Sequence, residues 1–208
     1  MNSDIPKQFM VLAKLPVILH SVLAFTKFDP SVQVVIALPE NYFALWNEIC
    51  EKHVYKYPHI LSKGGDTRFQ TVKRALKLIP DDRIVAVHDA VRPLVSESTI
   101  ERGFRDAFTF GNAIPVIPVS ESVRWSDGRK NQRVDREYLR IVQTPQVFDA
   151  SLIKRAYNRI TDDSFTDDAS VLEAMGETIH LFEGNRENIK ITYPDDLLVA
   201  EALMKRSG

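Results

Sequence analysis

The sequence predicts an α/β fold in which helices cover both faces of a mostly parallel β-sheet. Along most of the 208 residues, short apolar runs alternate with longer segments that carry apolar residues at helical spacing. The short runs have the composition of strands buried between two layers of helices. Hydrophobic residues make up 44% of the chain, which is enough for one sizeable core. This alternation is typical of a doubly wound, Rossmann-like sheet.

The first half of the chain supplies the predicted helices and strands in turn. Helices are expected where apolar residues recur every three or four positions, and strands where a short apolar run stands between two such segments. The predicted helices are 16–28, 41–53, 67–79 and 97–110. The predicted strands are 33–39, 59–65, 83–89 and 112–119.

The alternation stops at residue 120. Residues 120–143 are polar and strongly charged, and the central Ser-Asp-Gly-Arg-Lys-Asn is a turn signal. The two flanks are predicted to be the strands of a long hairpin. Since such an arm cannot bury itself on its own sheet, we expect it to project from the domain. Beyond it, the predicted helices are 149–160, 167–176 and 194–206, and the predicted strands are 177–184 and 189–193.

Composition limits the classes of function. The formal net charge of −1 favours neither nucleic acid nor an anionic membrane as a partner. Cys50 is the only cysteine, so no internal disulfide can form and a reducing compartment fits. No apolar run approaches the roughly 18 residues that a membrane span needs, and the polar N-terminus does not resemble a signal peptide. We expect a single cytoplasmic domain over residues 1–208.

A charged motif at the tip of a predicted strand is the first candidate site. In "VHDAVRP" (87–93), Asp89 falls where the strand ends. Open parallel sheets bind ligands beyond the carboxyl ends of their strands, and a carboxylate there can hold Mg²⁺ together with the phosphates of a nucleotide. The simpler alternative is that Asp89 caps a turn and pairs with Arg92.

Two further motifs each allow a structural and a functional interpretation. In "GGDTRFQTV" (64–72), the two glycines let the backbone approach a ligand, and the following helix N-terminus attracts anions; a plain strand-to-helix turn uses the same residues. In "SFTDDASVLE" (164–173), Asp167 and Asp168 could be metal ligands. Helix capping is the favoured explanation, with Thr166 as the N-cap.

Basic residues form the last two candidates. Lys190 interrupts a short apolar run, which fits either a solvated strand face or a lysine that binds phosphate at a cleft. The arm is usually interpreted as a solvated charged segment. Alternatively, it reaches a neighbouring subunit and clamps a phosphorylated substrate there. Its basic residues are Arg124, Arg129, Lys130, Arg133, Arg136 and Arg140.

In their order along the chain, five motifs resemble the 2-C-methyl-D-erythritol 4-phosphate cytidylyltransferase family. They are "GGDTR", "VHDAVRP", "VDREYLRIVQTPQVF", "TDDASVLE" and "NIKITYPDDLLVAEALM". The N-terminal "SDIPKQF" is similar too, so the resemblance extends from residue 1 to about residue 204. It implies transfer of CMP from CTP to 2-C-methyl-D-erythritol 4-phosphate, with release of pyrophosphate, in isoprenoid precursor biosynthesis. It also implies Mg²⁺ or another divalent cation as the cofactor.

The resemblance assigns five residues to the nucleotide. Lys7 matches the lysine of the family's "PKQ" segment and is expected to stabilise charge on the α-phosphate. Asp89 matches the family's metal-binding aspartate. Gly65 and Asp66 match the segment that reads the cytosine edge, and Thr71 stands where the family often has a serine near the base.

The acceptor side of the site follows from the same resemblance. Arg136 and Lys190 match the two residues that hold the substrate phosphate. In the family the arm mediates a homodimer, and the arm of the neighbour helps to close each site. Arg136 is therefore expected to act in trans. Ser122 and Arg124 fall at arm positions where the family commonly has threonine and lysine, and Glu187 stands where many members carry another acid.

The sequence departs from the family at its N-terminus. The family begins with a strand and a glycine-rich, phosphate-binding loop before "PKQ", whereas here Met1 stands where that loop ends. One alternative is therefore a non-catalytic nucleotide-binding module. Another is a cytidylyltransferase for a different alditol phosphate, such as ribitol 5-phosphate. A sugar-nucleotide glycosyltransferase is disfavoured because the chain has no Asp-x-Asp motif.

Overall fold

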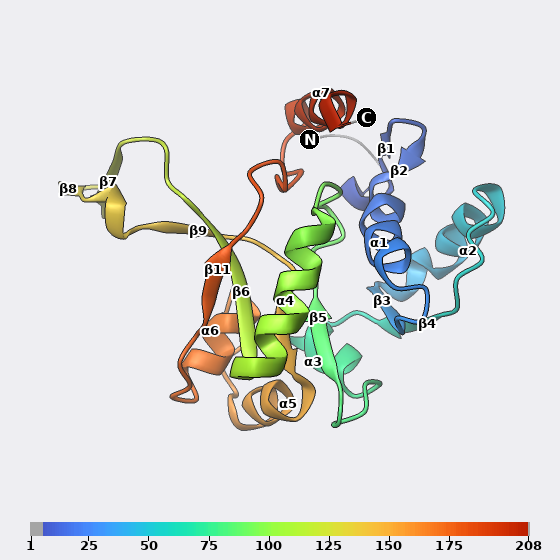
Figure 1. Ribbon diagram of the computed structural model, residues 1–208, viewed down its shortest axis with the longest axis horizontal. Coiled ribbons are helices and arrows are strands. Elements are labelled where there is room, and N and C mark those ends of the chain that lie inside the picture. Colours follow the sequence, from blue (N-terminus) through green and yellow to red (C-terminus); the bar gives the residue numbers. More distant parts are fainter. Residues whose placement is uncertain (1–5, 208) are drawn as a thin grey trace.

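The computed structural model describes residues 6–207, and its central feature is a mixed β-sheet with the strand order β11–β6–β10–β5 (Figure 1). Strands β5 and β6 are both antiparallel to β10, so they run in the same direction, and β11 is parallel to β6. The strand β9 pairs with β6 off this path. Their bounds are β5 (Ile84–Val87), β6 (Asn112–Pro118), β9 (Arg140–Val142), β10 (Gln146–Asp149) and β11 (Leu181–Glu183).

Helices cover both faces of this sheet because its strands alternate their apolar side chains between the faces. Val85 and Val87 pack on one side, in the cluster formed with α3, α5 and α6. Ile84 and Ala86 pack on the other side, against α4. The helices are α1 (Val17–Phe28), α2 (Phe43–Lys52), α3 (Arg68–Leu76), α4 (Glu97–Phe110), α5 (Ala150–Arg159), α6 (Asp168–Glu173) and α7 (Asp195–Ser207).

Caps in the sequence fix the helix ends. The Ser96 side chain accepts a hydrogen bond from the Thr99 backbone and begins α4, and Gly111 ends it with φ of +82°. Side chains of Thr67 and Asp149 cap α3 and α5 in the same way. The observed bounds of α4 equal the predicted range.

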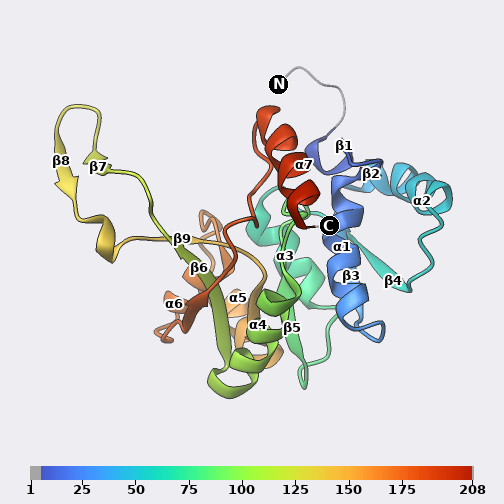
Figure 2. The same cartoon turned by 45° about the horizontal axis from the view of Figure 1, so that its top comes forward.

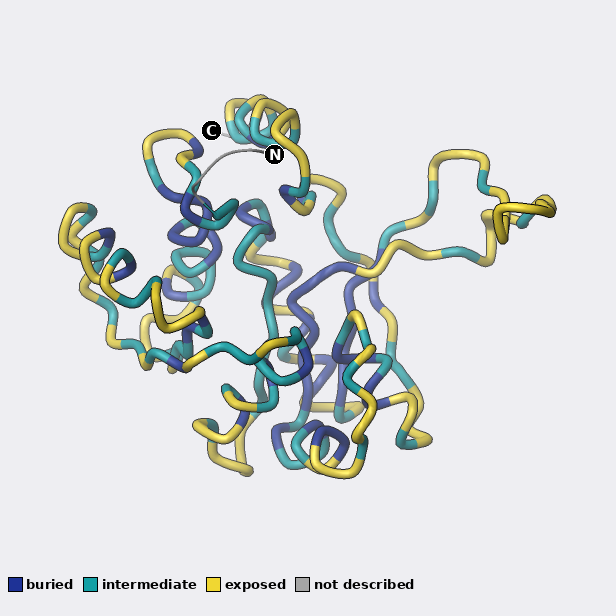
Figure 3. The backbone as a smooth tube through the Cα atoms, turned by 180° about the vertical axis from the view of Figure 1, so that it is seen from behind, coloured by how far each residue is buried: buried dark blue, intermediate teal, exposed yellow. Residues whose placement is uncertain are grey.

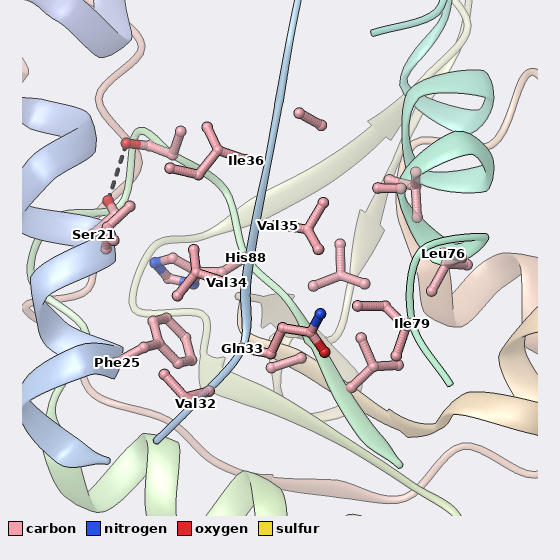
Figure 4. A pocket seen from close by; sticks show the side chains of 18 of the residues that line it. Ser21, Phe25, Val32, Gln33, Val34, Val35, Ile36, Leu76, Ile79 and His88 are labelled. Carbon is pink, nitrogen blue, oxygen red and sulfur yellow. Dashed lines mark hydrogen bonds between the residues drawn. The ribbon is translucent and has the colours of Figure 1, made fainter. Parts of the chain in front are cut away.

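A smaller sheet lies beside the central one. Its strands β3 (Val34–Leu38) and β4 (His59–Lys63) are parallel. Within the described part of the chain no ladder joins β3 to β5. A cavity of about 920 Å³ separates them, with walls formed by β3, β5, α1 and α3. Figure 4 shows apolar side chains such as Val34, Phe25 and Leu76 around it.

The arm projects from the body of the molecule (Figures 1 and 2) and is largely exposed (Figure 3). Strands β7 (Val123–Ser126) and β8 (Asn131–Val134) form an antiparallel hairpin, as predicted. The second flank is not one continuous strand. Asp135 caps a 3-10 turn, η3 (Arg136–Tyr138), and β9 begins only after it.

Other predictions of local structure were wrong. Residues 189–193 form no strand, because this segment bonds to the loop after β5 through Ile191 and Val91 instead of joining a ladder. The four-residue strand β10 was missed, since Pro145 directly before it reads as a turn signal. Further short elements are η1 (Lys7–Phe9), β1 (Val11–Leu12), β2 (Leu15–Pro16) and η2 (Glu40–Tyr42). Among residues 6–207, no helix has the length and apolarity that crossing a bilayer requires.

Candidate active site

Asp89 lies just beyond the carboxyl end of β5, where it meets two cationic side chains. Its Oδ2 atom is 3.1 Å from Lys190 Nζ and 3.4 Å from Arg92 Nε. Its backbone N–H donates to Thr144 Oγ1 over 3.0 Å, and its carbonyl accepts from the Arg92 backbone. The simple interpretation of a turn with an Asp89–Arg92 pair is therefore realised, and Lys190 joins it from a distant part of the chain.

The charges around Asp89 keep it ionised. Burial alone would raise the pKa of this carboxyl, but the neighbouring Lys190, Arg68 and Arg92 outweigh burial, so its pKa is lowered. Only 15% of the side chain is exposed. An ionised, partly covered carboxylate at a strand tip is a suitable ligand for a divalent cation.

A neutral histidine, His88, contacts the residues that surround Asp89. Burial lowers the pKa of His88 to about 4, so its ring is uncharged at neutral pH. His88 Nε2 lies 3.0 Å from the Arg92 carbonyl, and Nδ1 lies 3.0 Å from Thr144 Oγ1. These contacts are satisfied when Nε2 donates and Nδ1 accepts from the Thr144 hydroxyl, which in turn accepts from Asp89.

Asn188 fixes the loop that carries Lys190. It is completely buried, and its side-chain amide donates to the Thr144 carbonyl over 2.8 Å. Its own carbonyl accepts from Arg92 Nη1 over 2.7 Å and from Gln143 Nε2 over 3.3 Å. Buried hydrogen bonds of this kind, rather than a strand ladder, place Lys190 beside Asp89.

The glycine turn before α3 is closely packed. The Gly65 N–H donates to Thr71 Oγ1 over 2.8 Å, and the Thr71 hydroxyl donates to the Thr67 carbonyl over 2.9 Å. A Cβ atom on Gly65 would lie only 2.4 Å from the Cβ of Gln70, so this position needs a glycine. Asp66 is exposed, and its backbone N–H bonds the Gln70 side chain.

The two aspartates of "TDDAS" both have structural partners. Asp167, rather than the predicted Thr166, is the N-cap of α6 and accepts from the Ser170 backbone over 3.2 Å. Asp168 receives two hydrogen bonds from Arg68. No sequence motif indicated a role for Arg68; the only signal was its position within "GGDTR". Among residues 6–207, no three His, Cys, Asp or Glu side chains gather as a metal-binding group.

Within residues 6–207, two of the predicted site residues form no hydrogen bond or ion pair with Asp89. Arg136 is exposed on the arm and donates to the Ser120 carbonyl. Lys7 belongs to η1, and within residues 6–207 its side chain forms no hydrogen bond or ion pair. The structure brings together Asp89 and Lys190, and separately Gly65 and Thr71. Asp89 and Thr71 both line the cavity between β3 and β5, as does His88 in Figure 4.

Comparison with known proteins identifies the family. The model of the 2-C-methyl-D-erythritol 4-phosphate cytidylyltransferase family matches residues 1–206. The chain belongs to this family. The family's enzymes are nucleotidyltransferases, as the motifs predicted.

Individual 2-C-methyl-D-erythritol 4-phosphate cytidylyltransferases are similar over nearly their whole length. The enzyme of Bacteroides fragilis is 47% identical over 204 residues, which cover 98% of this chain and 93% of that protein. The enzyme of Bacteroides thetaiotaomicron is 44% identical with the same coverage. The crystal structure of the Thermus thermophilus enzyme has a TM-score of 0.80 at 32% identity, covering 96% of this chain and 94% of that one. The predicted α/β class is thereby confirmed.

Proposed function

We propose that this protein transfers CMP from CTP to 2-C-methyl-D-erythritol 4-phosphate. A phosphate oxygen of the acceptor attacks the α-phosphorus of CTP, the bond to the β-phosphate breaks, and pyrophosphate leaves. Two findings support this reaction: the chain belongs to the family, and it is similar to 2-C-methyl-D-erythritol 4-phosphate cytidylyltransferases. The observation that carries the proposal is the pair of Asp89 and Lys190, which brings a carboxylate that suits a cation next to an ammonium group that suits a phosphate, at one strand tip.

Asp89 fits a divalent cation that is shared with the substrate. Mg²⁺ is commonly held by one or two carboxylates and the phosphates of a nucleotide. Asp89 offers one ionised carboxylate, and no hydrogen bond from residues 6–207 reaches its Oδ1 atom. When bound, the cation would neutralise charge on the phosphates.

The protein's own residues then supply position and charge. Phosphoryl transfer depends chiefly on alignment and on stabilisation of charge. We assign Lys7 to the α-phosphate, and Lys190 to the phosphate of the acceptor. Gly65, Asp66 and Thr71 are assigned to the cytosine; the close packing at Gly65 gives the turn a fixed shape for that task.

Arg136 is assigned to the acceptor phosphate in a second subunit. The arm projects from the body of its own chain (Figure 2), which supports action in trans within a homodimer. The proposed enzyme works in the cytoplasm and takes no nucleic acid or membrane as a partner.

A turnover assay tests the reaction. The protein is supplied with CTP, Mg²⁺ and either 2-C-methyl-D-erythritol 4-phosphate or ribitol 5-phosphate, and pyrophosphate release is measured. We expect release with the first acceptor only. Release with ribitol 5-phosphate alone would favour the other alditol phosphate. CTP binding by calorimetry without release from either would support the non-catalytic alternative.

A further inference from the structure

Asp168 is a fully buried carboxylate at the start of α6. Nη1 and Nη2 of Arg68 donate to its two oxygens over 3.0 and 2.6 Å, and the Tyr157 hydroxyl donates to Oδ1 over 2.6 Å. A buried charge is tolerated only when it is paired and hydrogen-bonded. Asp168 therefore holds the guanidinium group of Arg68 in one orientation.

Arg68 is only partly buried. Its side chain remains 30% exposed, whereas that of Asp168 is not exposed at all. Arg68 and Asp89 both line the cavity between β3 and β5. They are also close enough for their opposite charges to attract each other. The Arg68 guanidinium group is thus bound by the Asp168 carboxylate, and it also attracts the Asp89 carboxylate electrostatically.

Gln146 links the elements next to these two carboxylates. Its Oε1 atom accepts from the backbone N–H groups of Asp168 and Ala169, over 3.0 and 2.8 Å. Gln146 also pairs with Val87 in the β5–β10 ladder, two residues before Asp89. The Gln146 side chain thus ties the start of α6 to β10, and β10 pairs with β5, whose end lies just before Asp89.

One carboxylate oxygen of Asp89, Oδ1, has no hydrogen-bond donor among the described residues. The closest approaches of Lys190 and Arg92 are both to Oδ2. A free guanidinium group could donate to the unpaired Oδ1 atom, and hydrogen bonds between charged groups are strong. An unrestrained Arg68 would therefore occupy the atom that a cation needs.

We propose that Asp168 is a positioning residue that retains Arg68 and so leaves Asp89 available to a divalent cation. This inference rests on the proposed function, since cation binding at Asp89 belongs to it. Asp168 touches neither the nucleotide nor the cation; it acts through Arg68. The pairing of Asp168 with Arg68 thereby affects cation binding as well as the stability of the core.

Binding of Mn²⁺ tests this proposal without any turnover. The dissociation constant for Mn²⁺ is measured by electron paramagnetic resonance of the free ion, with CTP present and no acceptor. Asp168→Asn removes the charge but keeps an oxygen that can accept from Tyr157. We expect it to weaken Mn²⁺ binding by about 10-fold, the loss that one charge-assisted competitor produces. Unchanged binding would overturn the proposal.

A second substitution separates positioning from simple structural support. In the double variant Asp168→Asn/Arg68→Gln, the guanidinium group of residue 68 is gone and cannot compete, so Mn²⁺ binding should recover to nearly the wild-type constant. A merely structural role would leave the double variant as weak as Asp168→Asn, and this outcome would refute the proposal. The double variant also serves alone if Asp168→Asn does not fold, because it removes both buried charges together.

Tyr157→Phe is the matched control. It removes one hydrogen bond to Asp168 but leaves the Arg68 pair intact. A lower Tm with an unchanged Mn²⁺ constant is expected, and weaker binding in this variant would contradict the assigned mechanism. If the wild-type protein with CTP binds no Mn²⁺ at all, the proposed function fails, and this inference fails with it.

Discussion

The tip of β5 and the arm carry the same kinds of charged residues in opposite environments. At the strand tip, Arg92 is 8% exposed and binds Asp89 together with two backbone carbonyls. On the arm, Arg136 is exposed and bonds one carbonyl of its own segment. A charge that is buried and fully paired has its position fixed by its own chain. A charge on a projecting arm acquires a defined partner only when something else meets it.

This contrast predicts that substitutions at the strand tip change the chemistry, whereas those on the arm change the binding of one substrate. The largest effect is expected for Asp89→Asn. It removes the charge that holds a cation and should lower turnover by about 10²–10³-fold. Pyrophosphate release at saturating CTP measures it, and circular dichroism checks the fold. Near-normal turnover in a folded variant would remove Asp89 from the site.

Arg136→Ala is expected to have the next largest effect. Loss of one phosphate-binding guanidinium should raise KM for the alcohol phosphate by about 10- to 100-fold and leave Tm unchanged. Arg129→Ala, a loss of charge at the hairpin turn, is the matched control. An unchanged KM for the acceptor in Arg136→Ala would argue that the arm is merely solvated.

Mixed dimers test whether the arm acts across subunits. When Asp89→Asn and Arg136→Ala chains are combined, each heterodimer retains one site with both native residues if Arg136 acts in trans. With the acceptor far below the raised KM of Arg136→Ala, random mixing should then restore about a quarter of the wild-type activity, since half of the dimers are heterodimers with one such site. If Arg136 serves its own chain, no activity returns.

The turn at Gly65 offers a smaller test within the body of the molecule. Thr71→Val removes the oxygen that accepts from the Gly65 N–H, and leaving this donor unpaired should cost about 1–3 kcal/mol of stability. KM for CTP should rise as the turn loosens. Thr71→Ser keeps the hydroxyl and should stay close to wild type. Equal KM values for CTP in the two variants would show that this hydroxyl does not shape the nucleotide site.

His88 predicts a pH effect at the strand tip. Because its pKa is lowered to about 4 in the folded protein, the unfolded chain binds the proton first as pH falls below about 6.5. The stabilisation that the neutral His88 ring contributes is therefore fully present above that pH and is lost as pH falls towards 4. At pH 5 the free energy of unfolding should be lower by about 2 kcal/mol. Urea unfolding at pH 7 and pH 5 should show a smaller difference in His88→Gln than in wild type. An equal difference would mean that His88 is not the buried neutral group described.

Particular residues show how far sequence patterns reach. The range of α4 could be predicted from Ser96 and Gly111 because caps are local signals. Asp89 could be chosen because it ends an apolar run. The partners of Asp168 could not be foreseen: Arg68 lies 100 residues away, and its motif explained a turn equally well. Segment 189–193 was wrongly predicted to be a strand, because apolar and polar residues alternate in the same way in a strand and in a loop that is held by buried side chains.

The sequence by itself determined the alternation of helices and strands, the projecting arm and the family, since these depend on local periodicity and on the order of motifs. Only the tertiary structure decided which charges meet. It placed Lys190 on Asp89 through Asn188 and Thr144, and it gave Arg68 to Asp168. Such pairings depend on desolvation and on geometry between segments far apart in the chain, and no local pattern encodes either of them.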